Sequence, residues 1–189
     1  MAGTAPVSDG GDAVVLARAD TALTDMSDVD VWLILKRYGG EVLLTLASDS
    51  GPDQRRWHLP GGRPDAGEHP TAAVLRHVRQ RVGLTVAEAD VRLATIVYWH
   101  DPRGVSRIGL FFAAEHDAST MGDPHISWPH DRAALKWSPR GLLPPGTDPV
   151  CAAGVGLARR GVSCAVLGPH GDITCETSTN PPPRTTVAI

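Results

Sequence analysis

GRPDAGEHPTAAVLRHVRQRVGL, residues 62–84, is the stretch that decides the fold. Pro70 suits the first turn of a helix, where its missing N–H is not needed. Gly83 suits the position just after a helix, because glycine accepts left-handed backbone. We therefore predict a helix over residues 70–82, with a core stripe drawn from Ala72, Leu75, Val78 and Val82.

The spacing of this stretch resembles the Nudix box, which reads Gly, five residues, Glu, seven residues, then Arg-Glu-apolar-any-Glu-Glu-any-Gly-apolar. The matching positions hold Gly62, Glu68, Arg76, Val78, Gly83 and Leu84. The three Glu positions of the helix instead hold His77, Gln80 and Arg81. Two flanking segments extend the resemblance: Trp57-His58-Leu59-Pro60-Gly61-Gly62 is similar to the family's W-x-L-P-G-G lead-in, and residues 136–144 are similar to its W-x-P-x-x-x-L-P segment.

The resemblance implies an α+β Nudix fold, an α/β/α sandwich around a mixed β-sheet. The hydrophobic patterns agree with it, because apolar and β-branched runs alternate with turn residues. Tyr38-Gly39-Gly40 predicts a hairpin, and Asp101 to Gly104 predicts a second turn. We predict strands at 29–37, 41–46, 57–59, 91–99, 106–114 and 135–137, a loop at 117–134, and a second helix at 149–160 ending at Gly161.

Composition is that of one folded domain with polar ends. We predict a flexible acidic arm at 1–27, a Nudix domain at 28–168 and a disordered tail at 169–189, which contains three consecutive prolines. The net charge of −3 and the lack of Lys/Arg blocks argue against long nucleic acids as partners. No apolar run approaches a membrane span, so we expect no membrane association and a cytoplasmic location. The odd number and wide spacing of Cys151, Cys164 and Cys175 favour free thiols.

The chemistry of the box depends on helical spacing. Residues three and four apart share a helix face, so His77, Gln80 and Arg81 lie together. In Nudix hydrolases that face carries carboxylates, which hold Mg²⁺ or Mn²⁺ for the attack of water on a diphosphate. Here its formal charge changes from −3 to about +1, which repels cations and attracts phosphate. Mg²⁺ or Mn²⁺ therefore becomes a doubtful cofactor, with Glu68 as a weak ligand and Glu115, Asp117 or Asp123 as off-box candidates.

The remaining site residues are predicted with their alternatives. His77 either transfers protons or is an imidazole tolerated on a solvent-facing helix surface. Glu68 is the other catalytic candidate, although the resemblance implies that Glu68 and Arg76 mainly orient the helix. Arg81 is either a phosphate contact or a surface arginine. Further candidates for substrate binding are Gln80, Gly61, Gly62, Arg56 and Trp99.

Three functions remain open. The first is a Nudix-type hydrolase of a small diphosphate-containing metabolite, such as a nucleoside diphosphate linked to another moiety, with altered metal dependence. The second is a non-hydrolytic module that binds a diphosphate or nucleotide. The third is a repurposed, metal-independent enzyme of secondary metabolism that uses His77 and Arg81. A homodimer is compatible with each of them.

Overall fold

The computed structural model describes residues 28–48, 55–101, 103–127, 132–168 and 172–174. The predicted arm, part of the predicted loop before residue 57 and most of the predicted tail lie outside these ranges. In chain order the elements are β1 (Val29–Arg37), β2 (Glu41–Ala47), β3 (Trp57–His58), β4 (Gly61–Gly62), α2 (Pro70–Val82), η1 (Glu88–Asp90), β5 (Arg92–His100), β6 (Ser106–Glu115), α3 (Ala118–Met121), β7 (Arg132–Pro139), α4 (Pro149–Arg160), β8 (Cys164–Leu167) and β9 (Ile173–Thr174).

The strands form one mixed sheet in the order β3-β2-β1-β6-β5-β8-β9, with β4 paired to β1 and β7 paired to β2. β1 is antiparallel to β2 and parallel to β6, while β5 is antiparallel to β6 and parallel to β8. The hairpin between β1 and β2 needs glycine, because Gly39 and Gly40 have φ values of 89° and 78°. The predicted hairpins and the mixed sheet are therefore confirmed.

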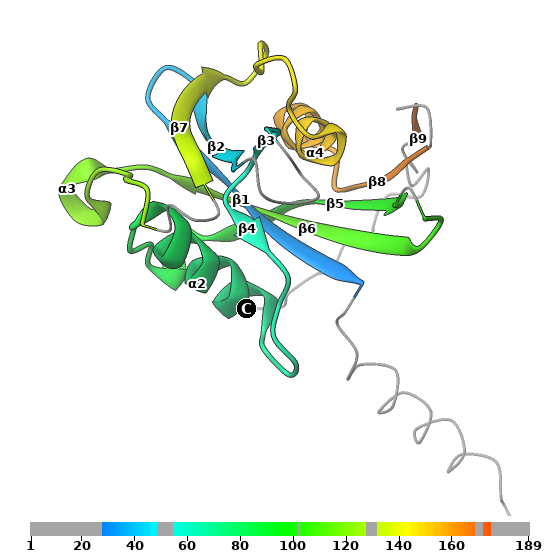
Figure 1. The fold of residues 1–189 in the computed structure, drawn as a ribbon, viewed down its shortest axis with the longest axis horizontal. Helices are drawn as coiled ribbons and strands as arrows, with labels where there is room; N and C mark the ends of the chain where they lie inside the picture. Colours follow the sequence, from blue (N-terminus) through cyan, green and yellow to red (C-terminus); the bar gives the residue numbers. More distant parts are fainter. Residues whose placement is uncertain (1–27, 49–54, 102, 128–131, 169–171, 175–189) are drawn as a thin grey trace, which may run out of the picture.

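One helix covers each face of the sheet (Figure 1). Side chains along a strand alternate between faces, and in β1 they divide two apolar cores. Leu33 packs with α2 residues such as Val74, whereas Ile34 packs with α4 residues such as Val155. The predicted α/β/α sandwich is confirmed.

Helix α2 has the predicted bounds but a different buried stripe. Its first turn is capped by His69, whose side chain accepts a hydrogen bond from the Thr71 N–H, and Gly83 ends it with a φ of 69°. Ala72 is exposed, so this predicted core position is wrong, whereas Leu75 is half-buried and packs against the core on the α2 side. Val78 and Val82 are buried as predicted, and the buried stripe extends to residues that the prediction did not include. The buried residues are Ala73, Val74, His77, Val78 and Val82.

Several short elements differ from prediction. The predicted loop at 117–134 contains α3, and β7 begins at Arg132 because it pairs along the whole of β2. β8 and β9 were not predicted, since strands of four and two residues carry little periodic signal. β9 also lies beyond residue 168, the predicted end of the domain, and pairs with β8.

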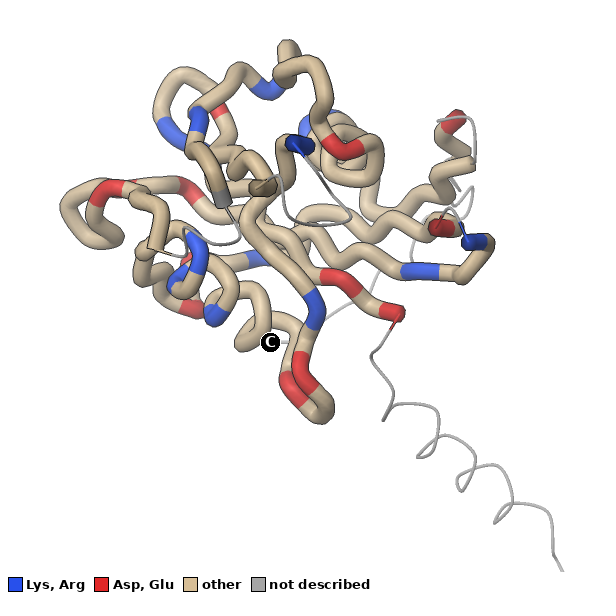
Figure 2. Tube along the Cα trace, in the orientation of Figure 1, with Lys and Arg blue, Asp and Glu red and all other residues tan. Residues whose placement is uncertain are grey.

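Three further observations concern the charges, the helices and the cysteines. Basic and acidic residues are interspersed along the chain trace (Figure 2). None of the helices within the described ranges combines the length and hydropathy that a bilayer crossing needs. Cys151 is a buried free thiol and Cys164 an exposed one, as predicted, while Cys175 lies outside the described residues.

Candidate functional site

An ion pair joins the box loop to its helix. Arg76 donates from Nε to Glu68 Oε1 at 2.8 Å and from Nη2 to Glu68 Oε2 at 2.6 Å. Glu68 Oε2 also accepts the Asp65 N–H at 2.8 Å. These donors, with Arg76 first, lower the pKa of Glu68 to about 2. The carboxylate is therefore ionised at neutral pH and already engaged, which suits a clamp better than a proton acceptor.

His77 lies inside the protein rather than on a solvent-facing surface. Its side chain belongs to the buried set, with 8% of the residue exposed. Nε2 lies 2.8 Å from the Arg63 carbonyl oxygen, which can only accept, so Nε2 carries the proton. Burial is the main cause that lowers the pKa of His77, so the ring is neutral at pH 7. The solvent-facing interpretation is wrong, and proton transfer by His77 stays a prediction that would have to use Nδ1.

Gly61 and Gly62 are glycines for a packing reason. A Cβ on Gly61 would lie 2.1 Å from the Val31 carbonyl oxygen, and a Cβ on Gly62 would lie 2.6 Å from the His77 ring. The sequence predicted close approach to a ligand at this turn. In the structure, neighbouring protein atoms occupy the space beside both α-carbons, and substrate binding by Gly61 and Gly62 stays a prediction.

The rest of the box face is more open. Gln80 is exposed and Arg81 is half-buried. A later loop covers the end of the helix, with the Ser127 N–H donating to the Arg81 carbonyl at 3.2 Å and the His125 N–H to the Val82 carbonyl at 3.0 Å. Gln80 and Arg81 therefore remain candidates for ligand contact on the surface of α2.

The box residues do not fit Mg²⁺. Mg²⁺ requires several oxygen ligands at about 2.1 Å, normally including carboxylates. Helix α2, PTAAVLRHVRQRV, contains no Asp or Glu. Both oxygens of Glu68 already accept hydrogen bonds, and the Arg63 carbonyl accepts one from His77 and a longer one from Arg76 at 3.3 Å. A cation would have to displace these donors.

The other predicted contacts lie elsewhere in the fold. Arg56 is largely exposed and lies 4.0 Å from Asp148 Oδ2. Trp99 is buried and packs beside Trp32, with ring centroids 5.7 Å apart, so its position favours core packing. Ligand binding by Arg56 and Trp99 stays a prediction. Of the off-box carboxylates, Glu115 pairs with Lys36 at 2.5 Å and Asp117 caps α3, and metal binding by Glu115, Asp117 or Asp123 stays a prediction.

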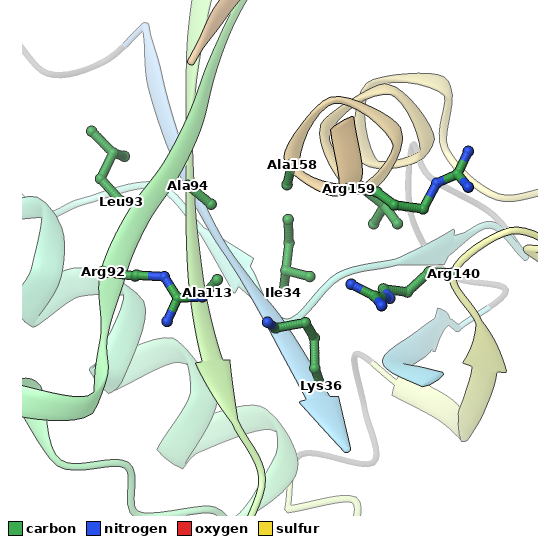
Figure 3. Close-up of a pocket in the computed structure, with 10 residues that line it drawn as sticks. Ile34, Lys36, Arg92, Leu93, Ala94, Ala113, Arg140, Ala158 and Arg159 are labelled. Carbon is green, nitrogen blue, oxygen red and sulfur yellow. The ribbon is translucent and has the colours of Figure 1, made fainter. Parts of the chain in front are cut away.

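A basic cavity of about 200 Å³ lies on the α4 face of the sheet (Figure 3). Its floor includes Ile34 and Val155, which belong to the core beneath α4, so the sheet separates it from α2. The Arg140 side chain extends toward Lys36 from one side, and the Lys36 nitrogen points the other way, toward the side of Arg92 (Figure 3). Its charged lining residues are all cations: Lys36, Arg92, Arg140 and Arg159. The cavity can therefore attract a small anion, although Glu115 partly neutralises Lys36.

A second cluster combines three kinds of metal ligand. One ligand atom each from His58, Asp148 and Cys151 lies within 4.8 Å of the other two. Sequence reasoning missed this cluster and the basic cavity. Asp148 and Cys151 share the first turn of α4, but His58 is far away in sequence, and no spacing rule connects them.

The comparisons with known proteins agree on the fold. The MutT NUDIX hydrolase of Burkholderia pseudomallei superposes with a TM-score of 0.60 and 23% identity, covering 68% of this chain and 95% of that one. The MutT protein of Methanosarcina mazei Go1 superposes with a TM-score of 0.58 and 19% identity, covering 70% of this chain and 92% of that one. At these identities the likeness concerns the fold.

A curated relative matches over a shorter segment. The RNA pyrophosphohydrolase of Acidiphilium cryptum (strain JF-5) is 39% identical over 69 residues, which are 36% of this chain and 41% of that protein. The match thus spans less than half of the relative's length. The family model for the NUDIX domain matches residues 26–153, about two thirds of the chain. This protein therefore belongs to the Nudix family.

Proposed function

We propose that this protein is a Nudix-type hydrolase of a small diphosphate-containing metabolite whose metal use differs from that of a box rich in carboxylates. The observation that carries the proposal is the intact frame of the box. Arg76 holds Glu68 with two hydrogen bonds, and the loop carbonyl at Arg63 is held by the buried His77 ring. Because the polar groups of the frame have hydrogen-bond partners, the frame supports a site that still positions a ligand.

The groups available for chemistry differ from those of a metal-binding face. Arg81 can form paired, charge-assisted hydrogen bonds to phosphate oxygens, and Gln80 can donate from its amide. His77, as a neutral ring with its proton on Nε2, can accept a proton only at Nδ1. We assign phosphate binding to Arg81 and Gln80, and proton transfer to His77.

A second candidate function is a non-hydrolytic module that binds a diphosphate. One observation favours it: the Glu68 carboxylate and the Arg63 carbonyl already accept hydrogen bonds from protein donors. A metal ion that activates water would therefore lack ligands in this loop. A binding module needs only anion recognition, which the cations of the site supply.

The proposed substrate is small rather than a long polynucleotide. The curated relative's name refers to RNA, but its match covers 41% of that protein. This chain has a net charge of −3, and its bases and acids are interspersed (Figure 2). A polyanion needs many phosphate contacts on one basic surface. We therefore extend only the diphosphate chemistry of the family to this chain.

The test is a panel of nucleoside di- and triphosphates, dinucleotides, sugar nucleotides, prenyl diphosphates and RNA with a terminal triphosphate. Each compound is incubated with the full chain, with and without Mg²⁺ or Mn²⁺, and release of phosphate or monophosphate is measured beside a thermal-shift assay. Turnover that Arg76→Ala reduces and Arg79→Ala leaves unchanged supports the hydrolase, because Arg76 holds Glu68 whereas Arg79 is exposed on the same helix. Stabilisation by a diphosphate without turnover supports the binding module. No turnover and no binding contradicts both.

A further inference from the structure

We propose that His58, Asp148 and Cys151 form a binding site for Zn²⁺ or a similar divalent transition metal, on the α4 side of the sheet. The proposal is independent of the hydrolase assignment. Its basis is the donor set: an imidazole, a carboxylate and a thiol whose ligand atoms lie within 4.8 Å of one another. These are the three ligand types of protein zinc sites, whereas Mg²⁺ disfavours sulfur and prefers oxygen.

The backbone holds the three residues in place. The Trp57 N–H donates to the Gly146 carbonyl at 3.1 Å, and the Asp148 N–H donates to the Trp57 carbonyl at 2.9 Å. His58 is the next residue after Trp57 and is paired with Thr45 of β2. These two hydrogen bonds of Trp57 tie β3 to the segment just before α4. Zn²⁺ with bonds of about 2.0–2.3 Å sets its ligand atoms roughly 3.3–3.8 Å apart, so side-chain shifts of about 1 Å complete the geometry.

Asp148 caps α4 with one of its two carboxylate oxygens. Oδ1 caps α4 by accepting the N–H groups of Val150 and Cys151, each at 3.0 Å. Oδ2 has Arg56 at 4.0 Å, and the Arg56 side chain is 54% exposed. Arg56 can therefore turn into solvent when a cation takes its place. The helix cap and the metal ligand are different atoms of one carboxylate.

Once the Cys151 thiol is ionised, the charges of the ligands favour a cation at this cluster. The amino end of α4 carries about half a positive charge, which opposes a metal ion but favours thiolate and carboxylate. Two anionic ligands outweigh this, and with neutral His58 they balance the charge of Zn²⁺. Binding of the metal displaces the Cys151 thiol proton, because cysteine ligates as a thiolate. Three protein ligands leave the fourth tetrahedral position for water or another small ligand.

The test uses cobalt as a spectroscopic substitute for zinc. Cys164→Ser and Cys175→Ser are introduced together, so that Cys151 is the one remaining thiol of the three in the chain. The metal-free protein is titrated with Co²⁺, and we expect one ion per chain, a thiolate charge-transfer band, visible bands typical of tetrahedral Co²⁺, and displacement by Zn²⁺. Zn²⁺, and not Mg²⁺, should raise the melting temperature.

Variants then assign the ligands. His58→Gln should weaken Co²⁺ binding at least tenfold, and adding Cys151→Ser should abolish the thiolate band. Asp148→Asn keeps the cap of α4 but removes the anionic ligand, so it separates metal binding from folding. A folded parent that shows no thiolate band overturns the proposal, as does a band that survives Cys151→Ser. Equal Co²⁺ affinity in Asp148→Asn and its parent also contradicts the three-residue site.

Discussion

Rebuilding the box carboxylates is the sharpest test of where the helix face points. The variant combines His77→Glu, Gln80→Glu and Arg81→Glu, which lowers the charge of α2 by four units: one at each of the first two positions and two at the third. Without metal, we expect it to be less stable than the parent by about 2–4 kcal/mol. The Nε2–H···O bond to the Arg63 carbonyl, worth about 1 kcal/mol, is lost, and a buried carboxylate then faces that carbonyl and two like charges.

Mg²⁺ should return much of that stability to the variant alone. At a concentration about a hundredfold above its Kd, a ligand adds roughly 2.7 kcal/mol to the free energy of unfolding. For a domain of this size that is a rise of roughly 5–10 °C in Tm. The assay is thermal unfolding of the parent and the variant in EDTA, in Mg²⁺, and in NaCl of equal ionic strength.

A charge-matched control makes the result specific. Ala72→Glu, Arg79→Glu and Thr85→Glu together change the charge by the same four units at exposed positions on or just after α2. This control should show no more response to Mg²⁺ than to NaCl. If the restored variant and the control respond equally, the effect is general screening of added charge, and residues 77, 80 and 81 do not form the face that the box predicts.

Three further predictions concern the same site. Glu68→Gln should lower the free energy of unfolding by about 1–2 kcal/mol at pH 7, allowing for the partial exposure of the ion pair. Because the pKa of Glu68 is lowered from 4.5 to about 2, this difference from the parent should shrink as the pH falls through that window, which urea unfolding measures. The pKa of His77 is lowered from 6.5, so below pH 6.5 the unfolded chain takes up a proton that the folded chain does not. The free energy of unfolding of the parent should therefore fall by at most about 1.4 kcal/mol per pH unit there. His77→Gln, which keeps a donor for the loop carbonyl, should show a smaller fall. Arg81→Ala should weaken binding of the diphosphate ligand tenfold to a hundredfold, about 1.5–3 kcal/mol, in calorimetry. If Arg140→Ala has that effect and Arg81→Ala does not, the anion binds in the basic cavity on the α4 face.

The sequence was sufficient for elements whose ends carry local signals. Pro70 and Gly83 bounded α2 because a missing N–H and a left-handed backbone are properties of single residues. The same reasoning placed α4 between Pro149 and Gly161. It failed for β8, whose four residues pair with β5 across a large separation in the chain. Short strands exist through their partners, and a partner is not visible in a local window.

The site was less predictable because burial depends on tertiary packing. Helical spacing put position 77 on the box face, but it could not show that the ring lies under Gly62 and reaches the Arg63 carbonyl. Likewise, the sequence could not show that Trp99, a candidate for substrate binding, packs beside Trp32 in the core. Charge and residue type give the chemistry that a face can perform. The neighbours decide which atoms remain available for it.

The replacement of glutamate by His77 changes what the box needs in order to be stable. A carboxylate at this position would have no proton to offer the Arg63 carbonyl and would depend on a cation to offset repulsion within the loop. The imidazole supplies that proton from Nε2, stays neutral in its buried position, and fills the space against Gly62. The frame of the box is therefore held together without a cation, because Arg76 holds Glu68 and His77 holds the loop. The imidazole at position 77 therefore removes the need for a cation to hold the loop and the helix of the box together.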